Sequence, residues 1–468
     1  MAALSDRKIE IVRTLVEAAP DKIVGGLQQA LSETGGDTVL ASIRQLVEAE
    51  AKDRLLRNAI FQPVVPLCVG VGFSKQSLVF PAYALALIWR GLKTSAPHEV
   101  LAAVTVWEAV AAAEAAARRP PDVSRAFDDV VAAAAHCLLT SEQREFRTAV
   151  ELCDRARPGG GEALAACLDI APVVRRTLAR LPDWVIHLDE ETGAAARLAY
   201  KDAVAIAEDA GPRFFEMLAS QLTPPWMILR IISSIMDKPT ERYLADSELG
   251  GFPERVMNEI DESLNLIGKL DLDAGPTAGR AAAKAVALIT QQVFELEVCI
   301  ELTRESGWGH RVVEQKKALA SLVESRLRGS EKLIAAALPT LSSGFSRPRR
   351  TGPNLDQAPD PKPIGRVMTL LTFAHEIRHS ANHGGFSAMH TKVMEMVWSA
   401  VESYSEDVLS DLRNGDVEDL AIAHAYLRAA ADMAGLIHDE KAAELVRRRA
   451  AAACLPAENA EAAGSLAT

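Results

Sequence analysis

The amino-acid sequence predicts an all-α protein, built as an irregular multi-helix bundle or an α-solenoid-like array with no substantial β-sheet. Three observations predict this class. Aromatic residues make up only 5% of the 468 residues, while alanine fills tracts such as 132–135 and 450–453, a composition that favours helices over strands. Apolar residues recur at helical spacing through most of the chain. No stretch of six or more residues alternates convincingly, and no repeat of 30 to 45 residues recurs.

The first predicted region, residues 1–157, is helical. Ser5 and Asp6 can cap a first helix whose apolar stripe occupies positions 9, 12, 15 and 16. Pro20 and the Gly35–Gly36 pair separate the next helices. Further helices are predicted over residues 22–31, 38–58, 99–118, 123–139 and 142–157.

Residues 61–89 interrupt this pattern with two apolar runs that contain several prolines and glycines. Lys75, Gln76 and Pro81 break these runs, so no clean stretch of about 18 apolar residues remains for a membrane-spanning helix. We expect a buried hairpin in the core here and no integral membrane segment.

Four further regions follow the Pro-Gly-Gly-Gly run at 158–161, which predicts a hinge between domains. A central helical domain is expected over 162–338, with a very apolar helix at 226–236 and long helices at 255–270, 281–305 and 312–338. A Pro-rich linker is expected over 339–365. A C-terminal helical module over 366–455 and a disordered tail over 456–468 complete the chain.

Charge and cysteine content limit the class of function. The net charge of −12 disfavours binding to nucleic acid. The six cysteines form no C-x-x-C pair, and the N-terminus has no apolar segment typical of a secretory signal. We therefore expect a cytoplasmic protein with reduced thiols.

One motif could carry chemistry. His375-Glu376-Ile377-Arg378-His379 has the form H-E-x-x-H, which places two imidazoles four residues apart on one face of a helix, beside a carboxylate. With about 100° per residue, His383 falls on the same face. Such spacing suits two zinc ligands with the glutamate as general base toward a bound water.

The motif resembles the zincin metallopeptidase signature over about ten residues, including the apolar lead-in at 372–374. The resemblance implies that His375 and His379 bind zinc and that Glu376 is the catalytic base. A third ligand would come from the following helix, where Glu402 and Glu395 are the candidates, with Glu406 further on. Arg378 and Asn382 depart from the family's extended patterns, so His383 does not match the third ligand of the metzincin branch.

Two functions follow from the two environments that this helix face could have. If it meets solvent, no cofactor is expected, and the chain is a non-catalytic cytoplasmic protein that acts as a protein-interaction or scaffold module, with a protein partner or with itself. If it lines a cleft, His375, His379, His383 and Glu402 could hold zinc, and the chain is a zinc-dependent metallohydrolase, most simply a peptidase. The same stripe of histidines could also hold zinc or iron in a helical bundle without peptidase activity. The absence of any other convincing cofactor motif favours the first function.

Overall fold

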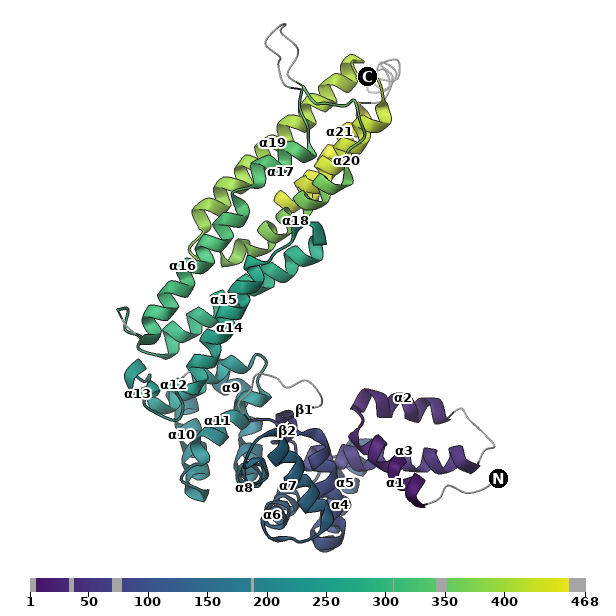
Figure 1. The fold of residues 1–468 in the computed structure, drawn as a ribbon, viewed down its shortest axis with the longest axis vertical. Coiled ribbons are helices and arrows are strands. Elements are labelled where there is room, and N and C mark those ends of the chain that lie inside the picture. The colour runs from purple at the N-terminus through teal and green to yellow at the C-terminus, as the bar shows by residue number, and fades with distance from the viewer. Residues whose placement is uncertain are drawn as a thin grey trace. The chain divides into compact units, whose positions relative to one another are not determined.

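A computed structural model of the chain describes residues 6–32, 38–69, 78–186, 189–305, 307–341 and 352–453. The protein is all-α, as predicted (Figure 1). The described residues contain a single sheet, formed by two strands of two residues each. The chain forms two compact units, Met1–Pro239 and Thr240–Thr468.

The first unit is an irregular array of helices. Helix α8 is its central element, because it packs against α6, α7, α10 and α11 and has eleven buried residues. In chain order the helices and strands are α1 (Asp6–Ala18), α2 (Asp21–Ser32), α3 (Thr38–Ile60), η1 (Val65–Leu67), β1 (Cys68–Val69), β2 (Phe80–Pro81), α4 (Ala82–Ser95), α5 (Pro97–Ala115), α6 (Ser124–Thr140), α7 (Arg144–Ala156), α8 (Gly160–Leu178), α9 (Leu181–Ile186), α10 (Glu190–Ile206), α11 (Ala210–Gln221), η2 (Pro225–Met227) and α12 (Ile228–Met236).

The hairpin predicted within 61–89 is wrong. Strands β1 and β2 pair in parallel, with Cys68 opposite Phe80 and Val69 opposite Pro81, whereas a hairpin requires antiparallel strands. The second apolar run forms α4, which buries eight of its fourteen residues. Because α4 is buried on most sides, its sequence shows no amphipathic period that would distinguish a helix from a strand. Residues 70–77 lie outside the described part of the chain.

Within the Pro-Gly-Gly-Gly run at 158–161, Pro158 and Gly159 form a tight turn in the first unit, and Gly160 and Gly161 begin α8. Gly159 has a φ of 71° and precedes α8, and this left-handed conformation favours glycine. Helices α7 and α8 on either side pack against each other. The compact units therefore separate at Pro239 and Thr240, and not at this turn.

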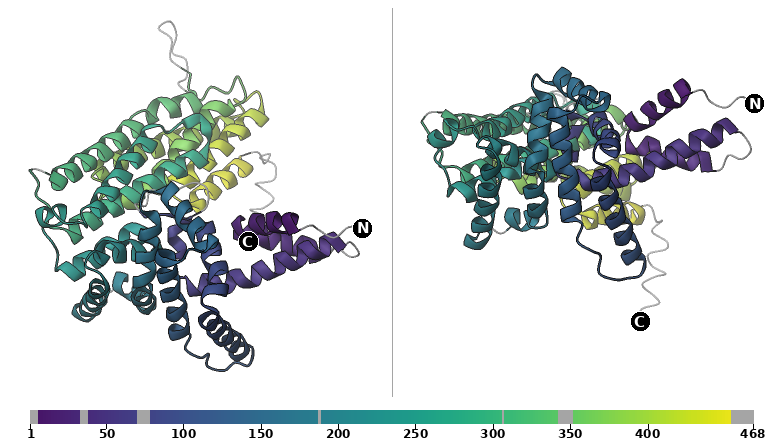
Figure 2. Two further views of the ribbon diagram at one scale, coloured as in Figure 1. Left: turned by 60° about the horizontal axis from the view of Figure 1, so that its bottom comes forward. Right: turned by 90° about the horizontal axis from the view of Figure 1, so that it is seen from below.

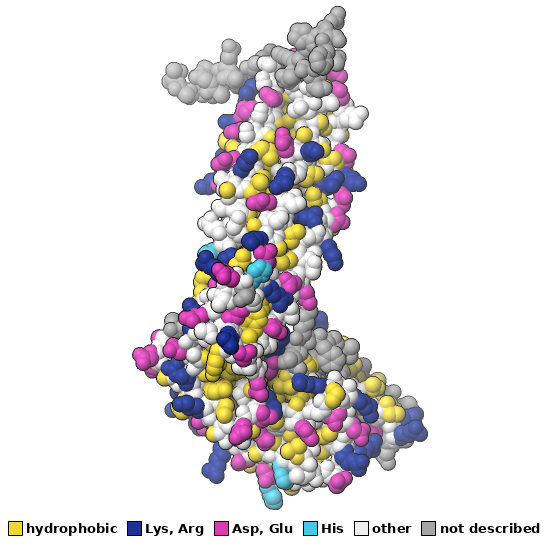
Figure 3. Space-filling model, turned by 60° about the vertical axis from the view of Figure 1, so that its left-hand side comes forward, with side chains coloured by type: hydrophobic (Ala, Val, Ile, Leu, Met, Phe, Trp, Pro, Cys, Tyr) yellow, Lys and Arg dark blue, Asp and Glu magenta, His cyan; other side chains and the backbone are white. Residues whose placement is uncertain are grey.

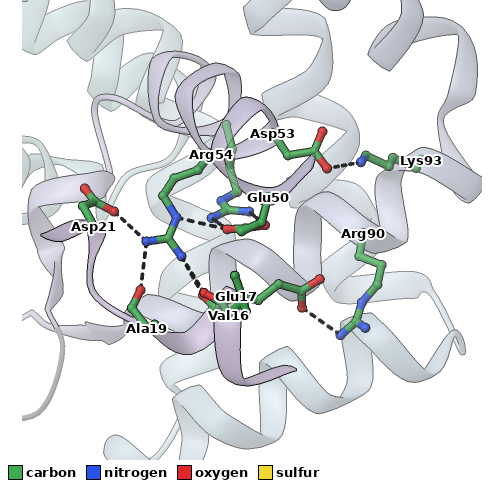
Figure 4. A network of polar contacts seen from close by, with 10 residues as sticks. Val16, Glu17, Ala19, Asp21, Glu50, Asp53, Arg54, Arg90 and Lys93 are labelled. Carbon is green, nitrogen blue, oxygen red and sulfur yellow. Dashed lines mark hydrogen bonds and ion pairs between the residues drawn. The ribbon is translucent and has the colours of Figure 1, made fainter. Parts of the chain in front are cut away.

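Helices α1 and α3 are joined by a buried ionic network (Figure 4). The Arg54 guanidinium donates to the carbonyl oxygens of Val16, Glu17 and Ala19 at the end of α1, over 3.0, 3.2 and 2.8 Å. It also donates to Glu50 over 3.0 Å. A cation at these carbonyls satisfies groups that have no partner within α1 and suits the negative end of the helix dipole.

The second unit consists of helices that lie side by side along much of their length (Figure 2). Helix α18 occupies its centre, with α15, α17 and α20 packed against it. In chain order the helices are α13 (Glu241–Ala245), α14 (Gly251–Gly268), η3 (Leu272–Ala274), α15 (Pro276–Cys299), α16 (Gly307–Leu327), α17 (Ser330–Ala337), α18 (Pro361–Ile377), η4 (Arg378–Ser380), α19 (Ser387–Asn414), α20 (Leu420–Ile437) and α21 (Glu440–Ala452).

A close crossing fixes α18 against α15. A Cβ atom added to Gly279 would lie 2.5 Å from the carbonyl oxygen of Thr369, so glycine allows the two backbones to approach here. Buried Val286 and Ile289 of α15 and buried Leu370 and Phe373 of α18 belong to the core of this unit. This packing positions the end of α18, which carries the H-E-x-x-H motif.

The predicted Pro-rich linker overlaps with ordered structure at its end. Helix α18 begins at Pro361, where Asp360 accepts a hydrogen bond from the Lys362 amide over 2.9 Å. A proline in the first turn of a helix loses no intrahelical hydrogen bond, which is why this proline-rich sequence can begin a helix. Residues 342–351 of the predicted linker and all of the predicted tail at 456–468 lie outside the described residues.

Helix α20 is the one helix of the described chain that is long and apolar enough to cross a membrane. It is packed against α18, α19 and α21, and its residues Tyr426, Leu427 and Met433 are buried. Buried core helices of other proteins have the same length and composition.

Candidate functional site

The helix that carries the H-E-x-x-H motif ends within the motif. Helix α18 stops at Ile377, the short 3₁₀ helix η4 covers 378–380, and a turn follows over 381–385. Gly385, with a φ of 76°, and the buried ring of Phe386 close this end, as is common where helices terminate. The prediction that one helical face continues from His375 to His383 is therefore wrong.

His375 makes a structural contact at the end of another helix. Its Nδ1 lies 2.7 Å from the carbonyl oxygen of Leu436 in the last turn of α20. Because a carbonyl oxygen only accepts, Nδ1 carries the proton and donates it. The imidazole thus satisfies one of the carbonyls that α20 leaves without an intrahelical partner.

The other two motif residues point elsewhere. The Glu376 side chain is 49% exposed, and its Oε1 lies 3.9 Å from Nε of Arg280 on α15. His379 is exposed, and its Nε2 accepts a hydrogen bond from Nε of Arg378 over 3.0 Å. A guanidinium at Nε2 occupies the lone pair that a zinc ion would need.

The remaining predicted ligands, His383 and Glu402, have other neighbours. His383 is exposed and contacts Phe294 edge-on, with ring centroids 6.2 Å apart. Glu402 lies on α19 and lines a hollow with Trp398 and His438. In the described residues no group of three or more His, Cys, Asp or Glu side chains has a geometry that could hold a metal ion. The structure therefore does not bring the predicted metal ligands together.

A second histidine at this end of α18 was not identified from the sequence. His390, in the first turn of α19, has its Nε2 2.8 Å from the carbonyl oxygen of Ala374 and donates to it. His375 and His390 thus satisfy carbonyls at the ends of α20 and α18 and tie α18, α19 and α20 to one another. Both imidazoles are used as helix caps, a role that the sequence pattern alone does not distinguish from metal binding.

The second unit also contains a buried carboxylate with many partners. Glu241 accepts hydrogen bonds from the amides of Trp308, Gly309 and Thr303 over 2.5, 3.1 and 3.1 Å, and from the Thr303 hydroxyl over 3.1 Å. The first two amides belong to the first turn of α16, where an anion is favourable. Glu241 therefore anchors α16, and its oxygens are already used by the protein.

Burial makes four of the thiols poor nucleophiles. Burial raises the pKa of the Cys153 and Cys167 thiols to about 12 each, and burial also raises the pKa of Cys68 and Cys137. Reactive cysteines instead have a lowered pKa in electropositive, accessible surroundings. These four cysteines are therefore suited to packing.

Comparison of the chain with known protein families, with curated proteins and with solved structures found no match. Any proposal about its function thus rests on the residues and the structure alone.

Proposed function

We propose that this chain is a non-catalytic helical protein that binds another protein, or a second copy of itself, through apolar helix surfaces. Helix α5 supports this proposal, because few of its residues are buried. Of its nineteen residues, Val100 and Ala103 are buried, although most of its sequence is alanine, valine or leucine. A helix that is apolar on all sides is normally buried.

The exposed part of α5 has the composition of an interface. Leu101 is 64% exposed, and Ala102, Ala109, Ala111 and Ala112 are exposed as well. Small side chains allow a second helix to approach closely, and a leucine that becomes buried contributes about 1.5 to 3 kcal/mol. Along this helix, Glu108 forms an exposed ion pair with Lys52 of α3 over 3.4 Å.

The distribution of charge supports a protein partner over nucleic acid. The net charge is −12, and acidic and basic side chains alternate with hydrophobic ones on the face shown in Figure 3. A protein that binds nucleic acid usually concentrates Lys and Arg on one face.

Substitution of an exposed leucine of α5 by a charged residue tests this proposal. Leu101→Asp is compared with Leu198→Asp, which changes a residue of the same unit that is 62% exposed on α10. Sedimentation velocity measures self-association, and in-cell cross-linking with quantitative mass spectrometry measures binding to other proteins. We expect the wild type and Leu198→Asp to form the same complexes, and Leu101→Asp to lose them. Identical behaviour of all three proteins would contradict the proposal.

A further inference from the structure

The second unit has a hollow on its surface between two parallel helices. Helices α19, α20 and α21 follow one another with short connections, so that α19 and α21 run in the same direction and both pack on α20. Between α19 and α21 lies a hollow of about 360 Å³, with Ala434 of α20 among its lining residues. Its lining includes residues 398 to 409 of α19, a length of about 16 Å at 1.5 Å per residue.

Apolar side chains form most of the walls of this hollow. Leu445 and Val446 of α21 line it, together with Val401 and Leu409 of α19, which are each only 1% exposed. Leu445 is 51% exposed. Trp398 closes one end, with its ring 4.3 Å from that of His438 and nearly perpendicular to it. The lining positions recur every three or four residues on both helices, which is the spacing that receives the apolar face of a third helix.

Charged side chains at the hollow are mainly acidic. Three carboxylates line it, from Glu402, Glu406 and Asp439, against one guanidinium, from Arg449. Arg449 is already paired with Glu406. No ion pair to Glu402 occurs within the described ranges, and its side chain is exposed on the wall of α19. A lysine or arginine of an incoming helix would complement this carboxylate.

We infer that this hollow is a docking groove for a basic amphipathic helix of a partner protein, which inserts apolar side chains at positions i, i+3 or i+4, and i+7 and places a lysine or arginine against Glu402. The chain's own last residues, 454–468, do not have this chemistry, because they contain two glutamates and no lysine or arginine. The groove lies in the second unit and α5 in the first, so this inference is independent of the proposed role of α5.

The experiment begins with a displayed library of random helical peptides of fourteen residues. Peptides that bind the whole chain are selected from this library. Fluorescence anisotropy then measures the affinity of the most enriched peptide for four variants. Leu445→Asn and Glu402→Lys change the groove. Leu266→Asn and Glu395→Lys are their controls, because Leu266 is also 51% exposed on α14 and Glu395 is exposed on α19 outside the hollow.

We expect enriched peptides with the stated apolar spacing and at least one Lys or Arg. Each groove variant should weaken binding by about tenfold or more, as for central interface residues, and each control should leave it unchanged. Peptides without basic residues, the absence of enriched peptides, or equal losses in groove and control variants would overturn the inference. A dimer of the chain that Leu445→Asn alone dissociates would also overturn it, since a second copy would then occupy the groove.

Discussion

His375 and His379 belong to the same motif but have different environments. The His375 imidazole donates to the Leu436 carbonyl, whereas His379 is exposed and accepts from Arg378. The sequence predicted which residues could bind a metal, because their types and spacing are visible in it. It could not predict the carbonyl of Leu436, because that partner comes from a helix 61 residues further along the chain.

The two histidines should therefore differ in their effect on stability. We expect His375→Ala to lower the free energy of unfolding by about 1 kcal/mol, because it removes one partly buried hydrogen bond and leaves a carbonyl without a partner. His379→Ala should change it by less than about 0.5 kcal/mol, as exposed substitutions usually do. Urea denaturation monitored by circular dichroism measures both, and equal effects would contradict the capping role of His375.

Glu241 should be among the most sensitive residues of the second unit. Glu241→Ala removes the acceptor of three backbone amides and should lower the free energy of unfolding by about 3 kcal/mol or more. Glu395→Ala is the control, since this glutamate is exposed on α19. Denaturation of both variants in urea gives the comparison. A loss below about 1 kcal/mol for Glu241→Ala would show that water replaces the carboxylate at the start of α16.

Glu17 in the ionic network predicts a dependence of stability on pH. Its Oε2 lies 3.4 Å from Nη2 of Arg90 (Figure 4), yet burial raises the pKa of the Glu17 carboxyl, with a further increase from nearby Glu50 and a decrease from Arg90. The folded chain then binds more protons at this site than the unfolded chain. The contribution of Glu17 to stability is therefore fully present below the unfolded pKa and is lost as the pH rises through the folded pKa.

The measurement is hydrogen exchange of the α1 amides between about pH 5 and 8, corrected for the intrinsic exchange rate. Protection in the wild type should fall as the pH rises, and Glu17→Gln should reduce this slope. Glu10→Gln is the control, because Glu10 also contacts Arg90 but its side chain is 53% exposed. An unchanged slope in Glu17→Gln would assign the pH dependence to another group.

For individual helices, the sequence predicted that a helix is present more accurately than where it begins and ends. Helix α3 (38–60) lies close to its predicted range of 38–58, whereas α15 (276–299) begins five residues before and ends six residues before its predicted range of 281–305. The range 312–338, predicted as one helix, contains most of α16 together with α17, because Gly329 separates two segments with similar apolar spacing. Helix α16 also begins earlier than predicted, at Gly307, where its first turn meets Glu241 of α13. Such long-range contacts are not visible in local periodicity.

Gly307 gives a test of this helix start. Its φ is 61°, and a Cβ atom there would overlap with Oε1 of Glu241. We expect Gly307→Ala to lower the free energy of unfolding by about 2 kcal/mol or more, through backbone strain and the displaced carboxylate. In contrast, Gly365→Ala in the first turns of α18 meets no atom within 4 Å and should stabilise the chain by about 0.5 kcal/mol. Thermal unfolding distinguishes the two, and equal shifts in Tm would contradict this role of Gly307.

For the whole molecule, the class of fold could be predicted from the sequence, but the arrangement of the helices could not. Composition and helical spacing indicated an all-α chain, which the structure confirms. The separation of the compact units at Pro239 and Thr240 has no glycine run or long linker in the sequence to mark it. The exposed face of α5 and the groove between α19 and α21 also depend on which neighbouring helices are present, so neither could be located from sequence alone.

We propose that the whole chain acts by binding and not by zinc chemistry at residues 375–379. The most direct measurement is the zinc content of the purified full-length chain after equilibration with excess zinc and dialysis, compared with His375→Ala and His379→Ala. The His375 imidazole is hydrogen-bonded to the Leu436 carbonyl, and the His379 imidazole is hydrogen-bonded to the Arg378 guanidinium. We therefore predict no stoichiometric zinc in the wild type and the same zinc content in all three proteins. One zinc ion per chain in the wild type, lost in both variants, would contradict the account.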